Sequence, residues 1–234
     1  MQKNCSDKAC NCNLGLCTVD VKLFSSLDHE DQVFLASTSI HTDYKKGHSI
    51  ILQGSRANSI MIIRNGKVKL HNYDAEGKEY ILDILTKGDS IGENLFLEQS
   101  VFQYNVTCLS SVGICEISRE NFTNLLSKRP EAAINLIVSL SKKLSEANEM
   151  VQILSENNAV KRLSAFLLYR KSRLSDEEIE LTVDDIAASI NLRRETVSRK
   201  ISELQSLGLI KRKGKSKIII ANRNKLLEYL DEID

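Results

Sequence analysis

Residues 181–221 read LTVDDIAASINLRRETVSRKISELQSLGLIKRKGKSKIIIA, and this stretch decides which fold the C-terminal third of the chain adopts. Thr182 and Asp185 have the spacing of a capping box, in which each side chain bonds the other residue's backbone N–H. A short helix is therefore expected to begin there and to run through Ile190. Asn191 tolerates a left-handed backbone and is expected to form the turn that follows.

A second helix and a hairpin are expected after this turn. The helix should cover about residues 193–207 and end at Gly208, because glycine adopts the left-handed conformation that closes many helices. Two basic strands, Leu209–Arg212 and Lys217–Ala221, should then pair around Gly214. Cap, turn, helix, stop and hairpin in this order predict a winged helix-turn-helix, whose second helix enters the major groove of DNA.

The expected second helix has a polar face and an apolar face. Glu195, Ser198 and Arg199 lie at i, i+3 and i+4, which places them on one side. Ile201 and Leu204 should point back to the core of the domain. The polar face is therefore the one expected to meet DNA.

Charge is distributed unevenly along the 234 residues, although the formal net charge is only +1. Residues 193–225 contain eleven Lys and Arg but only two acidic residues, Glu195 and Glu203. A basic surface of this kind is expected to contact a phosphate backbone. Lys213 and Lys215, in the predicted wing, are the candidates for that contact.

The middle of the chain is expected to be a small all-β domain over about residues 20–120. Short apolar runs such as SIMIIRNGKVKLH alternate with turn signals such as AEGKE and KGDS. Asn65-Gly66 is a hairpin signal, because both residues accept positive φ. A short helix over residues 27–37 should precede the strands.

A long helix is expected after Pro130, a residue that suits the first turn of a helix. Leu136, Met150 and Ile153 are expected to pack on the helix's own chain. Other apolar residues follow the a/d spacing of a coiled coil over three heptads, which favours a parallel homodimer. Glu146 falls one step off this seam, so its closure buries no charge. The seam positions are Ala133, Ile137, Leu140, Leu144, Ala147, Val151 and Leu154.

Four of the six cysteines fall within the thirteen residues CSDKACNCNLGLC, from Cys5 to Cys17. The N-terminus lacks the basic and apolar regions of a signal peptide, and no apolar run approaches the ~18 residues of a membrane span. A cytoplasmic protein without a membrane partner is therefore expected. Because cytosolic thiols are normally reduced, the cluster favours a metal or redox role over a disulfide framework.

Three features resemble the CRP/FNR family of bacterial transcription regulators over nearly the whole chain. They are KGDSIGE at residues 87–93, the long helix, and RRETVSRKISELQSLGLIKRKGK at residues 193–215. The resemblance implies an α+β fold in four parts. These are a Cys-rich arm over residues 1–19, a cyclic-nucleotide-binding-like β-roll over 20–128, a dimerisation helix over 129–157 and a winged helix-turn-helix over 158–234.

The resemblance also implies partners. Homodimers of this family bind palindromic DNA, here expected to have half-sites resembling TGTGA or TTGA, and they alter transcription through contacts with RNA polymerase. Arginine can bond guanine O6 and N7 together, and glutamate can accept from cytosine N4. The family's base-reading positions map onto Arg194, Glu195, Ser198 and Arg199.

In the cyclic-nucleotide branch of the family, a Gly-Glu pair bonds the ribose and an Arg-Ser pair bonds the phosphate. Gly92-Glu93 is present here, but the phosphate-binding positions read Phe102-Gln103-Tyr104-Asn105, without arginine or serine. A buried phosphate would be poorly compensated by these residues. No cyclic nucleotide is therefore expected in the roll.

Similarity to the FNR-type sensors implies instead a [4Fe–4S] cluster held by three N-terminal cysteines and one from the roll. The signal would then be oxygen or nitric oxide. Cys5 is a substitute candidate, because Cys10-x-Cys12 is tighter than the family's usual gap, and Cys108 is expected to be a small buried hydrophobe. The expected ligands are Cys10, Cys12, Cys17 and Cys115.

Two other hypotheses stay open. The same regulator could be switched by thiol–disulfide exchange between an N-terminal cysteine and Cys115, or the chain could be a cyclic-nucleotide- or zinc-binding module without a transcriptional role. An enzyme is not expected, because no catalytic Ser/His/Asp or Cys/His arrangement and no phosphate loop occurs. The four histidines are scattered singly and are expected at the surface: His29, His41, His48 and His71.

Overall fold

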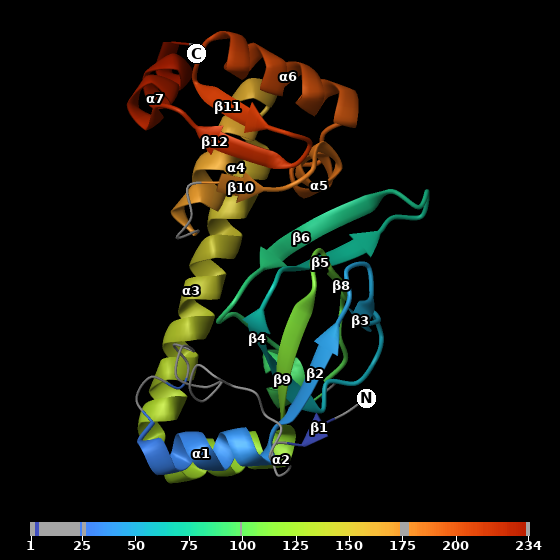
Figure 1. The fold of residues 1–234 in the computed structure, drawn as a ribbon, viewed down its shortest axis with the longest axis vertical. Helices are drawn as coiled ribbons and strands as arrows, with labels where there is room; N and C mark the ends of the chain where they lie inside the picture. Colours follow the sequence, from blue (N-terminus) through green and yellow to red (C-terminus); the bar gives the residue numbers. More distant parts are fainter. Residues whose placement is uncertain (1–2, 5–23, 25–26, 99, 174–177, 233–234) are drawn as a thin grey trace. The chain divides into compact units, whose positions relative to one another are not determined.

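The computed structural model describes residues 3–4, 24, 27–98, 100–173 and 178–232, which belong to two compact units (Figure 1). Residues 1–78 and 82–143 make up the first unit, and residues 79–81 and 144–234 the second. Among the helices that the structure describes, none combines the length and apolarity needed to cross a bilayer. The N-terminal cysteines lie outside the described residues, so the predicted ligands Cys10, Cys12 and Cys17 and their substitute Cys5 are not placed.

The first unit contains a β-roll of two antiparallel sheets, with strand orders β1-β2-β9-β4-β7 and β3-β8-β5-β6. Side chains from both sheets, such as Ile62, Val68 and Ile114, share one hydrophobic core. Its strands are β1 (Lys3–Asn4), β2 (Ile40–Tyr44), β3 (Ser49–Ile51), β4 (Ser59–Asn65), β5 (Val68–Tyr73), β6 (Glu79–Leu85), β7 (Ser90–Ile91), β8 (Asn105–Cys108) and β9 (Val112–Ser118). Its helices are α1 (His29–Thr38), the 3₁₀ turn η2 (Glu93–Phe96), α2 (Arg119–Lys128) and the first half of α3 (Pro130–Ser155).

The turn at Asn65-Gly66 forms, but the strands that it joins do not pair with each other, so the predicted hairpin is wrong. β4 lies between β9 and β7 in one sheet, whereas β5 lies between β8 and β6 in the other. Gly66 has a φ of +85°, and a Cβ at this position would lie 2.2 Å from the carbonyl oxygen of Ser111. Glycine is required because the chain passes close to another turn as it crosses between the sheets.

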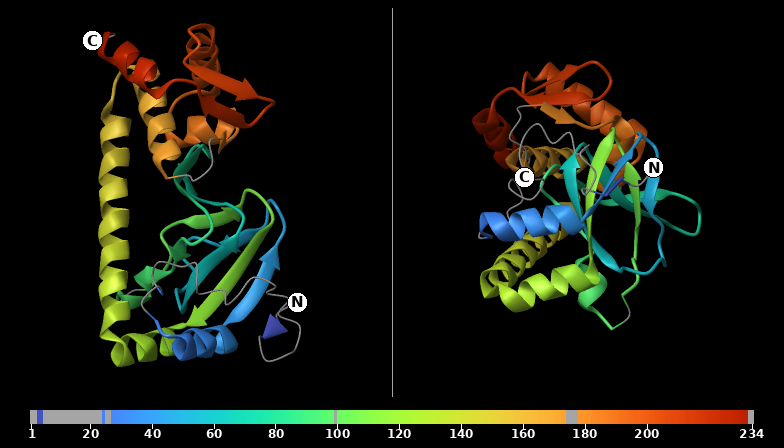
Figure 2. Two further views of the ribbon diagram at one scale, coloured as in Figure 1. Left: turned by 60° about the vertical axis from the view of Figure 1, so that its left-hand side comes forward. Right: turned by 60° about the horizontal axis from the view of Figure 1, so that its bottom comes forward.

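Helices α1 and α2 lie next to each other at one end of the roll (Figure 2). Asp28 caps α1 by accepting from the backbone N–H of Asp31, which confirms the helix predicted over residues 27–37 to within two residues. Arg129, which follows α2, forms ion pairs with Asp28 at 2.6 Å and with Asp31. The rings of Phe24 and Phe122 meet edge to face, with centroids 6.4 Å apart, and both are fully buried. Polar and apolar contacts together hold Phe24 and the start of α1 against α2.

Helix α3 begins at Pro130, as predicted, and carries two different stripes along its length. One stripe contacts its own chain and includes the buried residues Leu136 and Ile153. Glu146 belongs to this stripe and not to the seam, and it forms an ion pair with Arg173 of the next helix at 3.1 Å. The neighbouring stripe exposes large apolar side chains: Ile137 at 62%, Leu140 at 40%, Leu144 at 64%, Val151 at 62% and Leu154 at 38%.

The second unit contains the predicted winged helix-turn-helix. The capping box of Thr182 and Asp185 is present, and Asn191 with a φ of +49° and Gly208 with a positive φ are left-handed as expected. Gly214 lies between the two paired strands of the predicted hairpin. A strand that the sequence did not predict, β10, completes a sheet of order β10-β12-β11. The elements are α4 (Ala159–Ser172), β10 (Glu178–Glu180), α5 (Val183–Ser189), α6 (Arg194–Ser206), β11 (Ile210–Lys213), β12 (Lys217–Ile220) and α7 (Arg223–Glu232).

Replacing Gly66 by alanine should destabilise the roll more than replacing Gly77. Both glycines have positive φ, which costs alanine roughly 1–2 kcal/mol. A Cβ at Gly77 meets nothing within 4 Å, whereas one at Gly66 displaces the Ser111 carbonyl, for a further ~1–3 kcal/mol typical of overpacking. Urea unfolding of the two variants measures the difference. Equal losses would contradict the role assigned to the close approach at Gly66.

Candidate DNA-binding interface and signal site

The four residues predicted to read bases come from one helix, α6, and lie on its outer side. Arg194, Glu195 and Arg199 are exposed and Ser198 is half-buried. The opposite side of the helix is fully buried, because Val197, Ile201 and Leu204 have no exposed surface. Burial of this apolar face sets which side chains α6 presents to the outside of the second unit.

Arg194 is held by an acidic residue that the sequence did not point to. Its Nη1 donates to both carboxylate oxygens of Asp184, at 2.7 and 2.5 Å. Asp184 lies in the first turn of α5, whereas Arg194 is the first residue of α6. The two residues are ten positions apart on different helices, so no helical spacing could have indicated the contact.

The wing also contains acidic partners for its lysines. Glu178 of β10 accepts from Lys213 at 2.9 Å and from Lys217 at 2.7 Å, and Glu180 pairs with Lys217 at 3.1 Å. Hydrogen bonds from Lys217 and Lys213 lower the pKa of Glu178 to about 2. The Lys215 ammonium is exposed and has no partner among the residues that the structure describes. Of the two predicted wing lysines, Lys215 is therefore available in the free chain and Lys213 is paired.

The retained Gly92-Glu93 pair lies inside the roll, and its carboxylate is already paired. Lys143 of α3 donates to Glu93 Oε1 at 2.5 Å and to the Ser90 carbonyl oxygen at 2.6 Å, while the Ser90 hydroxyl donates to Glu93 at 2.5 Å. Burial opposes ionisation of Glu93, but the charge and hydrogen bond of Lys143 outweigh it, and the net effect lowers its pKa. Burial and the nearby Glu93 charge raise the pKa of Tyr104 to about 12.

Cys115 lies in the middle of β9, as predicted from its strand-like surroundings, and is 1% exposed. It stands opposite His41 of β2 on one side and opposite Ile62 of β4 on the other. His41 in turn stands opposite Lys3 of β1, so three adjacent strands are in register at this point. Nowhere in the described part of the chain do three or more His, Cys, Asp or Glu residues gather as a metal site would require.

Cys108 ends β8 and is 2% exposed, which confirms the expectation of a small buried residue. Its burial raises the pKa of the thiol. The expectation that all four histidines lie at the surface is wrong, since His41 and His71 are 9% and 4% exposed. His71 Nε2 bonds the Thr107 hydroxyl at 2.9 Å, so cross-strand pairing inside the sheet accounts for its burial.

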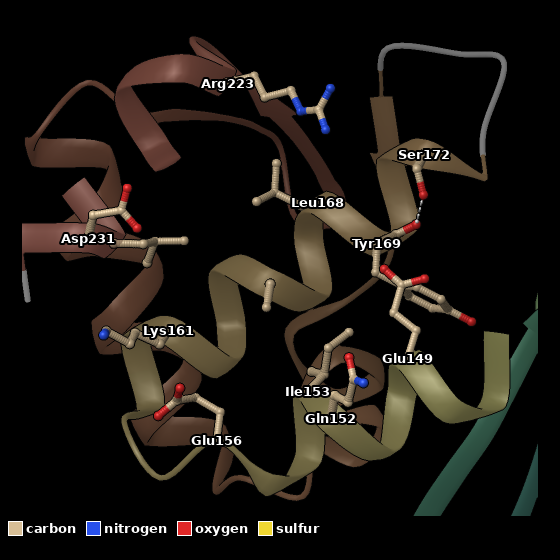
Figure 3. Close-up of a pocket in the computed structure, with 12 residues that line it drawn as sticks. Glu149, Gln152, Ile153, Glu156, Lys161, Leu168, Tyr169, Ser172, Arg223 and Asp231 are labelled. Atoms are coloured by element: carbon tan, nitrogen blue, oxygen red, sulfur yellow. Dashed lines mark hydrogen bonds between the residues drawn. The ribbon is translucent and has the colours of Figure 1, made fainter. Parts of the chain in front are cut away.

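An open cleft of about 510 Å³ lies in the second unit between α3, α4 and α7 (Figure 3). Its lining mixes acidic residues such as Glu149 and Asp231 with the basic residues Lys161 and Arg223. Of the predicted DNA-binding, metal-binding and seam residues that the structure describes, none lines it. The cleft is therefore separate from the predicted DNA-reading face of α6 and from the seam of α3.

Two family models match the chain, the cyclic nucleotide-binding domain at residues 41–129 and the Crp-like helix-turn-helix domain at residues 161–229. The chain is 30% identical over 224 residues to Electron transport regulator A of Shewanella oneidensis, covering 92% of this chain and 88% of that protein. It is also 29% identical over 197 residues to the cAMP-activated global transcriptional regulator CRP of Escherichia coli, covering 81% of this chain and 93% of that protein.

Among solved structures, FixK2 from Bradyrhizobium japonicum has a similar fold, with a TM-score of 0.73 and 21% identity over 81% of this chain and 96% of that chain. The two models together cover more than half of the sequence, and a relative matches along nearly the whole length. The chain belongs to the CRP/FNR family of transcription regulators.

Proposed function

We propose that this regulator responds to oxygen or nitric oxide through a [4Fe–4S] cluster, held by Cys115 and three cysteines of the N-terminal arm. The observation that carries the proposal is the position of Cys115 in the first sheet. It is in register, across β2, with β1, the strand that directly precedes Cys5 in the sequence. Two strand spacings separate β1 from β9, a distance of about 10 Å.

The ends of the cysteine-containing segment support this ligand set. Before it, Asn4 pairs with Ile40 of β2, and after it, Phe24 packs on Phe122 in the core of the same unit. Thiolates are the usual ligands of iron–sulfur clusters, and a [4Fe–4S] cluster takes four. The described residues offer no group of three possible ligands. The N-terminal arm would therefore have to supply the three thiolates needed in addition to Cys115. When bound, the cluster would supply an oxygen-labile link between arm and roll.

Pairing inside the roll supports a signal other than a cyclic nucleotide. The ribose-binding position, Glu93, is engaged by Lys143 and Ser90. A nucleotide would have to displace the lysine and leave a buried ammonium without its carboxylate, which is costly. In addition, the positions expected to bind the phosphate are occupied by Phe102-Gln103-Tyr104-Asn105, which provide no cation.

Members of this family bind DNA and act as dimers. For this chain we propose a palindromic target with half-sites resembling TGTGA or TTGA, recognised by one α6 helix from each subunit, and RNA polymerase as the transcriptional partner. The outward Arg194, Glu195 and Arg199 can bond base edges in the major groove. The exposed seam of α3 is the surface proposed to join the two copies.

Replacing Cys115 by serine should abolish cluster assembly and signal response, whereas replacing Cys108 by serine should leave both nearly unchanged. Both cysteines are buried in the roll, but only Cys115 lies in register with β1. Iron and acid-labile sulfide are measured after oxygen-free purification. A full cluster in Cys115→Ser would contradict the proposal. A wild-type protein without iron, whose response is nevertheless lost in Cys115→Ser, would favour the thiol–disulfide switch.

The protein without its cluster should be dimeric at micromolar concentration. The seam holds apolar side chains, and its nearest acid, Glu146, is paired with Arg173 within the chain, so closing the seam buries no charge. Leu144→Glu should shift sedimentation to the monomer, whereas Ser145→Glu, one position off the seam, should not. A wild-type monomer that dimerises only with iron would overturn this expectation.

Lys215→Ala should weaken binding to all DNA sequences alike and lower the salt slope by about 1, as expected for one lost phosphate contact. Lys213→Ala should have a smaller effect, because Glu178 already neutralises that lysine. Fluorescence anisotropy on a random-sequence duplex over a salt series gives both slopes. Equal reductions in the two variants would mean that Glu178 releases Lys213 on DNA.

A further inference from the structure

The ion pair between Asp184 and Arg194 joins the two helices of the helix-turn-helix at the surface assigned to DNA. Only one of the arginine's three nitrogen atoms takes part, since Nη1 donates to both oxygens of Asp184. No other residue that the structure describes accepts a hydrogen bond from Arg194. Nε and Nη2, whose N–H groups point along a common edge of the guanidinium, stay available.

Asp184 is not part of the capping box of α5, and its first-turn position contributes only the modest helix-dipole stabilisation of an exposed acid. The capping box uses its neighbour Asp185, whose side chain accepts from the Thr182 backbone and hydroxyl. The side chains of Asp184 and Arg194 are 61% and 62% exposed, and ion pairs at that exposure contribute little to stability. The carboxylate of Asp184 would nevertheless repel the phosphates of DNA bound at α6 and so lower the affinity. An acid at this position is therefore useful only if it also improves another part of DNA recognition.

The compensating effect follows from the geometry of guanine recognition. Guanine presents two acceptors, O6 and N7, side by side in the major groove, and arginine reads them with two parallel N–H groups. A guanidinium held through Nη1 offers such a pair along its Nε–Nη2 edge. Because its orientation is already restricted, less side-chain entropy is lost when the base contact forms.

We propose that Asp184 is a specificity-determining residue that positions Arg194 for guanine and withholds its charge from phosphates. This inference rests on the proposed DNA-binding role of α6. On guanine, the ion pair stays in place and directs the free edge of the arginine. On other sequences, Asp184 repels the backbone and prevents Arg194 from adding a sequence-independent phosphate contact. Asp184 thus raises the affinity for the cognate site and lowers the affinity for random DNA.

The test measures the affinity of the full-length protein for three kinds of duplex. The first carries inverted TGTGA or TTGA half-sites, the second is a series with each half-site base pair changed in turn, and the third has random sequence. Asp184→Asn should bind random DNA several-fold more tightly but lose about 10-fold in discrimination at one base pair, as expected when a single bidentate base contact is weakened. Combined with Arg194→Ala, it should have no further effect at that base pair.

Two further variants separate positioning from charge. Glu228→Gln removes the same charge from an exposed site on α7, where no ion pair forms among the described residues, and should tighten all binding slightly and equally. Asp184→Glu keeps the charge but moves the carboxylate outward by one methylene. It should keep the low affinity for random DNA and still lose discrimination at the same base pair.

The outcomes distinguish this inference from the function on which it rests. Equal effects of Asp184→Asn and Glu228→Gln, or lost discrimination at several base pairs, would overturn the role of Asp184 alone. A wild-type protein that binds half-site and random duplexes equally would overturn the DNA-site assignment and this inference with it. Thermal unfolding of Asp184→Asn should lie close to that of the wild type, with only the small loss expected for a first-turn acid, and a strongly lowered midpoint would indicate a structural role instead.

Discussion

Helix α3 has to combine two kinds of surface, because one stripe of the helix packs on its own chain and the neighbouring stripe exposes apolar side chains. One stripe contacts its own chain through Leu136, Lys143 and Ile153. The next stripe, about 100° around the helix, exposes the apolar residues of the seam. A helix of 26 residues can carry both only if every seven residues repeat the same division, which is the pattern in this chain. A substitution at a seam position should therefore affect the proposed dimer contact and leave the packing of α3 on its own chain intact. A substitution on the other stripe should do the reverse.

A second feature is that three cations at the sites described above have acidic partners from other elements. Lys143 pairs with Glu93, Lys213 with Glu178, and Arg194 with Asp184. In the roll, the Lys143 ammonium lies beside the Glu93 carboxylate, at the position that bonds a ribose in the cyclic-nucleotide branch of the family. In the second unit, Lys213 and Arg194 are likewise paired with carboxylates, whereas Lys215 has no partner among the described residues. Under the role proposed for Asp184, its ion pair with Arg194 stays in place on guanine and lowers the affinity for other sequences, so affinity is exchanged for selectivity.

Local signals predicted the elements of both units well. The capping box at Thr182, the stop at Gly208 and the start of α3 at Pro130 depend only on neighbouring residues, and all three form as expected. The hairpin predicted at Asn65-Gly66 was wrong. Turn residues determine where the chain reverses, but they do not determine which strands the segments on either side pair with. The burial of His41 and His71 was missed for a similar reason, since strand pairing places single polar residues inside the sheet.

The fold, the family, the polar face of α6 and the apolar seam of α3 could all be predicted from the amino-acid sequence, because periodicity and capping are properties of contiguous residues. Which charged side chains are already paired depends on tertiary packing. Asp184 lies ten residues before Arg194, Glu178 thirty-five before Lys213, and Glu93 fifty before Lys143. Each pair is made by the packing of one element on another, and no spacing along the chain specifies it. The same holds for Cys115, whose register with β1 across β2 is set by sheet pairing rather than by any motif around it.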